Sequence, residues 1–174
     1  MSISFESIIQ NKKRISKVLI LGPYRPIDSK TDEKPSICER RLQRLKQFLQ
    51  QKGFLNTFLV SDFPDESEVP RKAIMVHFLK KSMHYIEHWA DILIFVFLKD
   101  CDNSGVETEL SFMVFKVTHK CICSAVIRPN DIILSSLQWG QIELFRIRDL
   151  SYDEENEIED LVFSSCFNIL YSLD

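Results

Sequence analysis

The chain has 174 residues, of which 45% are apolar, and its formal net charge at pH 7 is −3. This length and composition suit a single globular domain over residues 1–174 with a substantial core, and the charge gives no reason to expect a nucleic-acid surface. Residues 1–14 carry their basic side chains after their apolar ones, without a long apolar core. They predict a short amphipathic lead-in helix, and neither a signal peptide nor a membrane span.

Strand and helix signals alternate along the rest of the chain. The predicted strands are residues 17–21, 54–60, 92–98, 121–127 and 142–147. The predicted helices are residues 36–51, a helix that begins at Pro70, residues 107–117 and residues 153–171. We expect a three-layer, doubly wound α/β fold of the flavodoxin or Rossmann type, with a mainly parallel five-stranded sheet in the order 2-1-3-4-5. In that order the loops after strands one and three meet over one crevice, where such sheets bind ligands.

Two carboxylates follow the third predicted strand. The apolar run 92–98 is typical of a strand that is covered on both faces, and the helix after it places Glu107 and Glu109 near the strand's carboxyl end. A carboxylate that is partly shielded there can act as nucleophile or general base. Alternatively, both side chains only complement the positive end of the helix, an effect of about 0.3 to 1 kcal/mol.

The loop after the first strand contains neither a GxGxxG nor a P-loop motif, so no nicotinamide or other cofactor is expected. It presents Tyr24 and Arg25 before a helix whose Ser36 and Glu39 form a predicted capping box. Free N–H groups at that helix start, together with Arg25, could hold a phosphate or carboxylate. The alternative is a proline-stiffened surface loop with solvated charges.

The cysteines and histidines predict no metal site. The five cysteines are odd in number and lack CxxC or zinc-ligand spacing, so we expect free thiols and a cytoplasmic location. His84 and His88 are one helical turn apart and could share a metal, but no third ligand is evident, and solvated side chains are the expectation.

Three short motifs carry a resemblance to a known family. They are Gly22-Pro23-Tyr24 after the first strand, Ala90-Asp91 at the start of the third, and the Gly-x-x-x-Glu-Leu segment 105–110. Over residues 17–128 the chain resembles the nucleoside 2-deoxyribosyltransferase-like superfamily, Rossmann-like proteins that cleave N-glycosidic bonds. The resemblance implies that Glu109 is the nucleophile that attacks the anomeric carbon, with Glu107 as its nearest rival.

The chain departs from the family's pattern around the proton donor. Family enzymes usually carry an Asp in the helix before the third strand and another just ahead of the nucleophile. This chain has Met83 next to His84 at the first place, and Asn103 next to Asp102 at the second. Asp102 and His84 therefore both remain candidates for the acid that protonates the leaving base. The expected substrate-binding residues are Gly22, Pro23, Tyr24, Arg25, Ser36, Asn103 and Gly105.

The function that we expect is cleavage of a nucleoside or nucleotide N-glycosidic bond, by transfer or hydrolysis. A catalytically silent nucleotide-binding module and a TIR-like domain that cleaves NAD or binds proteins are the alternatives. The helix predicted over 107–117 is apolar around nearly its whole circumference, which predicts a homodimer or higher homo-oligomer. Relatives commonly assemble in this way, so the resemblance points in the same direction. No membrane partner is expected.

Overall fold

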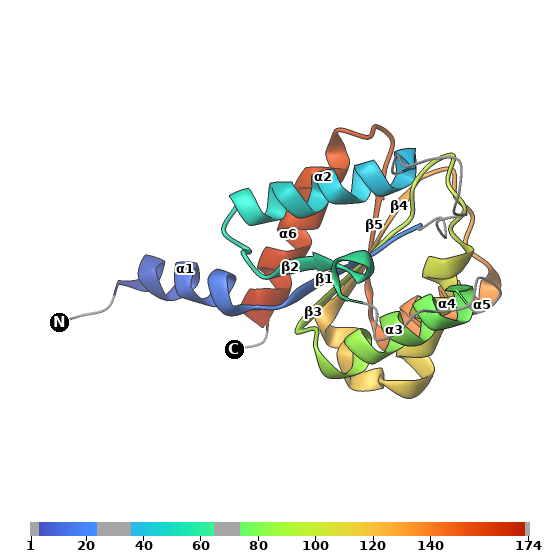
Figure 1. The fold of residues 1–174 in the computed structure, drawn as a ribbon, viewed down its shortest axis with the longest axis horizontal. Coiled ribbons are helices and arrows are strands. Elements are labelled where there is room, and N and C mark those ends of the chain that lie inside the picture. The colour runs from blue at the N-terminus through green and yellow to red at the C-terminus, as the bar shows by residue number, and fades with distance from the viewer. Residues whose placement is uncertain (1–3, 24–35, 65–73, 173–174) are drawn as a thin grey trace.

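The computed structural model describes residues 4–23, 36–64 and 74–172. Its centre is a five-stranded, all-parallel sheet in the order β2-β1-β3-β4-β5, which confirms the predicted fold and strand order (Figure 1). The strands are β1 (Val18–Leu21), β2 (Thr57–Leu59), β3 (Ile92–Val96), β4 (Ser124–Pro129) and β5 (Arg148–Tyr152). Val18 of β1 is in register with Thr57 of β2 on one side and with Ile92 of β3 on the other. The reversal in strand order therefore lies between β1 and β3.

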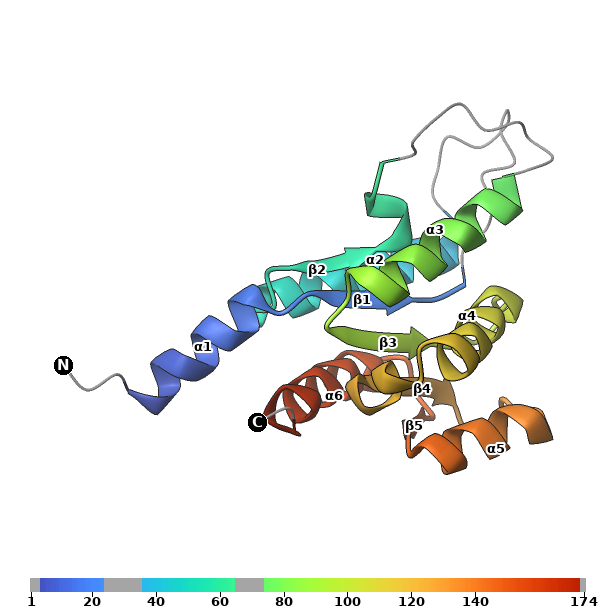
Figure 2. The same ribbon diagram turned by 90° about the horizontal axis from the view of Figure 1, so that it is seen from below.

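Helices cover both faces of the sheet (Figure 2). One face carries α2 (Ile37–Gln51) and α6 (Glu157–Ser172), and the other carries α3 (Ile74–His88), α4 (Ser104–Lys116) and α5 (Ser136–Phe145). Alternate β3 side chains enter the two cores, with Ile94 on the α2/α6 side and Phe95 on the α3/α4/α5 side. Each fully buried apolar side chain of this kind stabilises the fold by about 1.5–3 kcal/mol.

The lead-in segment forms α1 (Phe5–Ile15), which projects from one end of the sheet (Figure 1). The Ser4 hydroxyl caps it by accepting a hydrogen bond from the Ser7 N–H. At its other end Lys13 is buried, and its Nζ lies 5.1 Å and 5.2 Å from the ring centroids of Phe163 and Phe167 on α6. No described helix combines the length and the apolar character that crossing a bilayer requires.

The fifth strand was predicted in the wrong place. Residues 142–147 do not form a strand, because most of them belong to α5, and the strand follows at Arg148–Tyr152. The α5 helix buries the polar side chains of Gln138 and Gln141, so its sequence lacks a clear apolar stripe. β5 is an edge strand with charged, half-buried residues, and its first half does not show the apolar character of the central strands.

Other boundaries move by a few residues. α4 begins at Ser104, before the predicted residue 107, and β4 begins at Ser124, after a 3-10 helix η3 (Thr118–Cys123). β2 is only three residues long and runs into the short helix η1 (Val60–Asp62). The predicted helix start at Pro70 lies outside the described residues. None of these shifts changes the order of the sheet.

Candidate functional site

Glu109 is a buried carboxyl on the helix that follows β3. It lies in the second turn of α4, the helix that follows β3, and only 2% of the residue is exposed. Ser82 of α3, which is fully buried, is its hydrogen-bonding neighbour, and Glu109 Oε2 has no hydrogen-bond partner among the residues that the structure describes. A buried carboxyl with an unused acceptor is costly to keep charged.

The surroundings of Glu109 favour its neutral form. Burial raises its pKa to about 8, and the Ser82 hydroxyl opposes that shift only in part. Ser82 Oγ also donates a 2.9 Å hydrogen bond to the carbonyl of Leu79, so its single proton is already engaged. At pH 7 most Glu109 carboxyl groups are therefore protonated in this state. Such a group accepts or releases a proton near neutral pH when its surroundings change.

Glu107, the rival candidate, has a different environment. It is exposed in the first turn of α4, and two residues along a helix correspond to a rotation of about 200°. The structure therefore places the two carboxylates on different sides of the helix. An interaction with the helix dipole accounts for exposed Glu107, whereas it does not account for buried Glu109.

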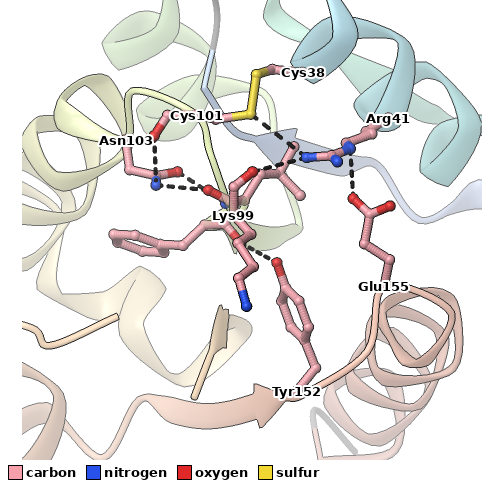
Figure 3. Close-up of polar contacts among 9 residues, drawn as sticks. Cys38, Arg41, Lys99, Cys101, Asn103, Tyr152 and Glu155 are labelled. Atoms are coloured by element: carbon pink, nitrogen blue, oxygen red, sulfur yellow. Dashed lines mark hydrogen bonds and ion pairs between the residues drawn. A yellow bond between two sulfur atoms is a disulfide. The ribbon is translucent and has the colours of Figure 1, made fainter. Parts of the chain in front are cut away.

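The loop between β3 and α4, residues 97–103, is organised by Asn103. Its Oδ1 accepts a hydrogen bond from Leu98 N at 3.0 Å, and its Nδ2 donates to the carbonyls of Leu98 (3.0 Å) and Cys101 (3.2 Å) (Figure 3). The amide of Asn103 is thus occupied within the loop, which shapes the backbone ahead of α4. In this state it has no free donor to offer a ligand.

Asp102 acts as a cap rather than as an acid. Its Oδ1 accepts a 3.0 Å hydrogen bond from the Ser104 N–H at the start of α4. Hydrogen bonds from the Ser104 backbone and side chain lower the pKa of Asp102, so this exposed carboxylate is charged at neutral pH. An ionised carboxylate has no proton to give to a leaving base.

The other expected acid, His84, is on the exposed side of α3. The centroid of its ring lies 5.0 Å from that of His88 and 5.3 Å from that of Tyr85. Ser82, two residues earlier, is the α3 residue that contacts Glu109, so His84 faces away from that carboxyl. The structure therefore does not bring His84 and Glu109 together. Within the described parts of the chain, no three side chains are grouped as metal ligands.

The end of β1 contributes packing. Gly22 and Pro23 are buried, and a Cβ atom on Gly22 would lie 2.4 Å from Cδ2 of Leu42, so a larger residue would displace the Leu42 side chain of α2. Ser36 is the N-cap of α2 and accepts a 3.2 Å hydrogen bond from Glu39 N, which is the serine half of the predicted capping box.

Gly105, another expected binding residue, is exposed on α4 with open space around it. Tyr24 and Arg25 lie outside the described residues.

A disulfide between Cys38 and Cys101 corrects the expectation of free thiols (Figure 3). The two Cα atoms are 6.2 Å apart, within the usual range for a bridge. The other cysteines, Cys121, Cys123 and Cys166, are free as predicted. The bridged residues are 63 positions apart in the chain, so no local pattern reveals their pairing. The prediction of a cytoplasmic location was based on free thiols, and this bridged pair does not support it.

Three side chains that the sequence did not single out hold the same loop (Figure 3). Arg41 of α2 donates from Nη1 to the carbonyl of Lys99 at 2.9 Å, and its Nε lies 2.5 Å from Glu155 Oε1. The Tyr152 hydroxyl donates to the carbonyl of Phe97 at 3.1 Å, and burial raises the pKa of Tyr152 to about 12. Contacts from α2, β5 and the turn before α6 therefore fix the backbone that leads to Glu109.

Comparison of the chain with protein-family models and with curated proteins finds no match. The residues described above are therefore the basis for inferring a function. Chemically, they provide one buried carboxyl whose pKa is raised to about 8, on the helix that follows β3 and the anchored loop 97–103.

Proposed function

We propose that the protein cleaves the N-glycosidic bond of a nucleoside or nucleotide, with Glu109 as the nucleophile. The observation that carries this proposal is the burial of Glu109, with one carboxyl oxygen unused, in the helix that follows β3. Purely structural carboxylates are rarely buried without partners, because desolvation of the charge is costly. The proposal is also supported by the start of α4 after β3, because doubly wound sheets bind ligands at the carboxyl ends of their strands.

The reaction would proceed through a covalent glycosyl ester. Ionised Glu109 attacks the anomeric carbon while the bond from that carbon to the base nitrogen breaks, and the electron pair of that bond leaves with the base, which takes up a proton from water. Water or a second base then attacks the same carbon and releases the carboxylate. The positive charge that develops on the sugar stabilises the ionised form of Glu109, which offsets the desolvation that otherwise keeps Glu109 neutral.

The second candidate is a nucleotide-binding module without cleavage. It is favoured by the placement of the expected acids: Asp102 is a charged cap, and His84 is on the exposed side of α3. Without a proton donor, departure of most bases is slow. Such a module would bind nucleotides and release no base.

Base release from a panel of nucleosides, nucleoside monophosphates and NAD tests both candidates. We expect release from at least one substrate, and a loss of about 10³-fold or more in Glu109→Gln, because an amide cannot form the ester. Glu107→Gln is the matched control and should retain activity. Binding without release favours the module, whereas full activity of Glu109→Gln contradicts the proposed mechanism.

We also propose that the chain self-associates through α4. Phe115 of this helix is 65% exposed, although Leu110, Met113 and Val114 are buried on its other sides. Ile122 of the adjoining η3 is similarly exposed. A second copy would cover this apolar surface and bring two Glu109 residues to one assembly.

A further inference from the structure

The Cys38–Cys101 disulfide crosses the place where the strand order reverses. Cys38 is in the first turn of α2, the helix after β1, and Cys101 is in the loop after β3. β1 and β3 are neighbours in the sheet, so the bridge ties together the two connections that flank this edge (Figure 3). In doubly wound folds ligands bind at this edge.

Apart from the bridge, Arg41 is the described link from α2 to the loop. Cys38 and Arg41 are three residues apart and share one face of α2, and the 2.9 Å hydrogen bond from Arg41 to the Lys99 carbonyl is on that face. The partner of Arg41 on the other side is Glu155, whose side chain is 52% exposed. The Arg41 link to the loop is a single hydrogen bond, which is much weaker than a covalent bond. Opening the disulfide would therefore remove the stronger of these two links.

The bridged sulfurs are better placed for exchange than the free thiols are. Cys38 and Cys101 are both half-buried, so a small thiol can approach them. Cys121 and Cys166 are buried, and burial raises the pKa of both thiols. Cys123 lies just before β4, at the opposite end of the sheet. The described free thiols are thus poor competitors for the bridge.

We propose that Cys38–Cys101 is a reversible thiol–disulfide site that controls the loop over residues 97–103, with a low-molecular-weight thiol and its disulfide as the exchanging couple. A thiolate of the couple attacks one sulfur, and the other protein sulfur leaves as a thiolate that takes up a proton. A second small thiol then resolves the mixed disulfide. In total, the protein disulfide is reduced to two thiols while two small thiols are oxidised to one small disulfide.

The reduced state differs from the oxidised one in the mobility of the loop. The side-chain hydrogen bonds of Asn103 within the loop and of Tyr152 to Phe97 remain. Apart from the packing of Leu98 in the core with α2, the described residues then leave Arg41 as the polar link between α2 and the loop. α4 starts directly after the loop and carries Glu109. The effect on catalysis therefore rests on the proposed function, whereas release of the loop does not.

Titration of the full chain with reduced and oxidised glutathione tests the exchange. Free thiols are alkylated at each ratio and located by mass spectrometry. We expect Cys38 and Cys101 to interconvert together and reversibly, while Cys121, Cys123 and Cys166 remain thiols throughout. The proposal would be overturned if the disulfide stayed closed at the highest thiol concentration that leaves the protein folded. The bond would then be a structural disulfide that does not exchange.

Hydrogen exchange of the two forms tests the consequence. Reduction should make the backbone amides of residues 98–104 exchange about tenfold faster or more, with little change in β3 or β4. Cys38→Ser should match the reduced protein even under oxidising conditions, and Cys123→Ser, which also removes a half-buried sulfur, should match the oxidised protein. Equal loop exchange in both forms would contradict the proposal.

Base release and nucleotide binding, measured on both forms, separate this inference from the proposed function. Reversible thiol–disulfide exchange with faster hydrogen exchange of the loop amides, but no nucleotide binding or base release in either form, would support the switch and contradict the function. Activity that is equal in both forms, with unchanged loop exchange, would support the function and overturn the switch.

Discussion

Ser82 on α3 and Glu109 on α4 meet at the contact between the two helices, and at most 2% of either residue is exposed. The serine proton is engaged by the Leu79 carbonyl, so the carboxyl is left with weak support for a negative charge. This relationship connects the stability of the fold with the chemistry proposed for Glu109.

Glu109→Gln should change how stability depends on pH. The pKa of Glu109 is about 8 in the folded protein, above the ordinary value of 4.5 that applies to the unfolded chain. Below pH 4.5 both states are protonated and the stability is fully present. Between these values the unfolded chain releases a proton that the folded protein keeps, so the free energy of unfolding falls with rising pH, by up to about 1.4 kcal/mol per pH unit.

Urea unfolding from pH 5 to pH 9 measures this difference. The free energy of unfolding of the wild type should fall by a few kcal/mol relative to that of Glu109→Gln as the pH rises to about 8, with little further loss above that. The free energy of unfolding of Glu107→Gln, which changes an exposed carboxylate, should depend on pH as that of the wild type does. Parallel curves for wild type and Glu109→Gln would show that Glu109 does not titrate in this range.

The rate of base release should follow the ionisation of the same group. If Glu109 must be charged to attack, kcat/KM reports its pKa in the free enzyme. We expect kcat/KM to rise about tenfold per pH unit below pH 8 and to level off above it, for a substrate that does not itself titrate there. A rate that is constant from pH 6 to pH 9 would assign the attack to another group.

The elements that the sequence predicted well are those with one dominant signal. β3 is a continuous run of fully buried apolar side chains, and α2 combines an N-cap at Ser36 with the buried leucines 42, 45 and 49 at helical spacing. Both patterns are local, so they can be recognised without knowledge of the fold. The strand order followed from their alternation and from the preference for right-handed crossovers.

The parts that could not be predicted depend on contacts between distant residues. α5 turns Gln138 and Gln141 inward, and the edge strand β5 carries Asp149 paired with Arg128 at 2.9 Å, so neither element shows the usual apolar pattern. The pairing of Cys38 with Cys101 and the anchoring of the loop by Arg41 likewise appear only in three dimensions. The family resemblance of segment 105–110 directed attention to Glu109, but its burial against α3 could not be predicted from the sequence.

Lys13 should contribute to the docking of α1. Its Nζ lies over the rings of Phe163, Phe167 and Phe54 at 5.1, 5.2 and 5.8 Å, and 7% of the residue is exposed. Lys13→Met keeps the apolar stem and removes the charge, so it should cost about 0.5–2 kcal/mol and speed hydrogen exchange in α1. Arg14→Met, at the exposed neighbouring position, is the control and should change little. Unchanged protection of α1 in Lys13→Met would mean that the charge does not hold the helix.

Phe115→Glu should disrupt self-association. Phe115 is 65% exposed on α4, and a charge at the centre of an apolar contact would have to be desolvated without a partner. Sedimentation velocity at micromolar concentration should show at least a dimer for wild type and a monomer for Phe115→Glu. Ile133→Glu is the matched control, because it places the same charge on a residue that is 92% exposed outside α4, and it should remain a dimer. A monomeric wild type, or a Phe115→Glu variant that still associates, would exclude α4 as the interface and would leave Phe115 as an ordinary exposed side chain.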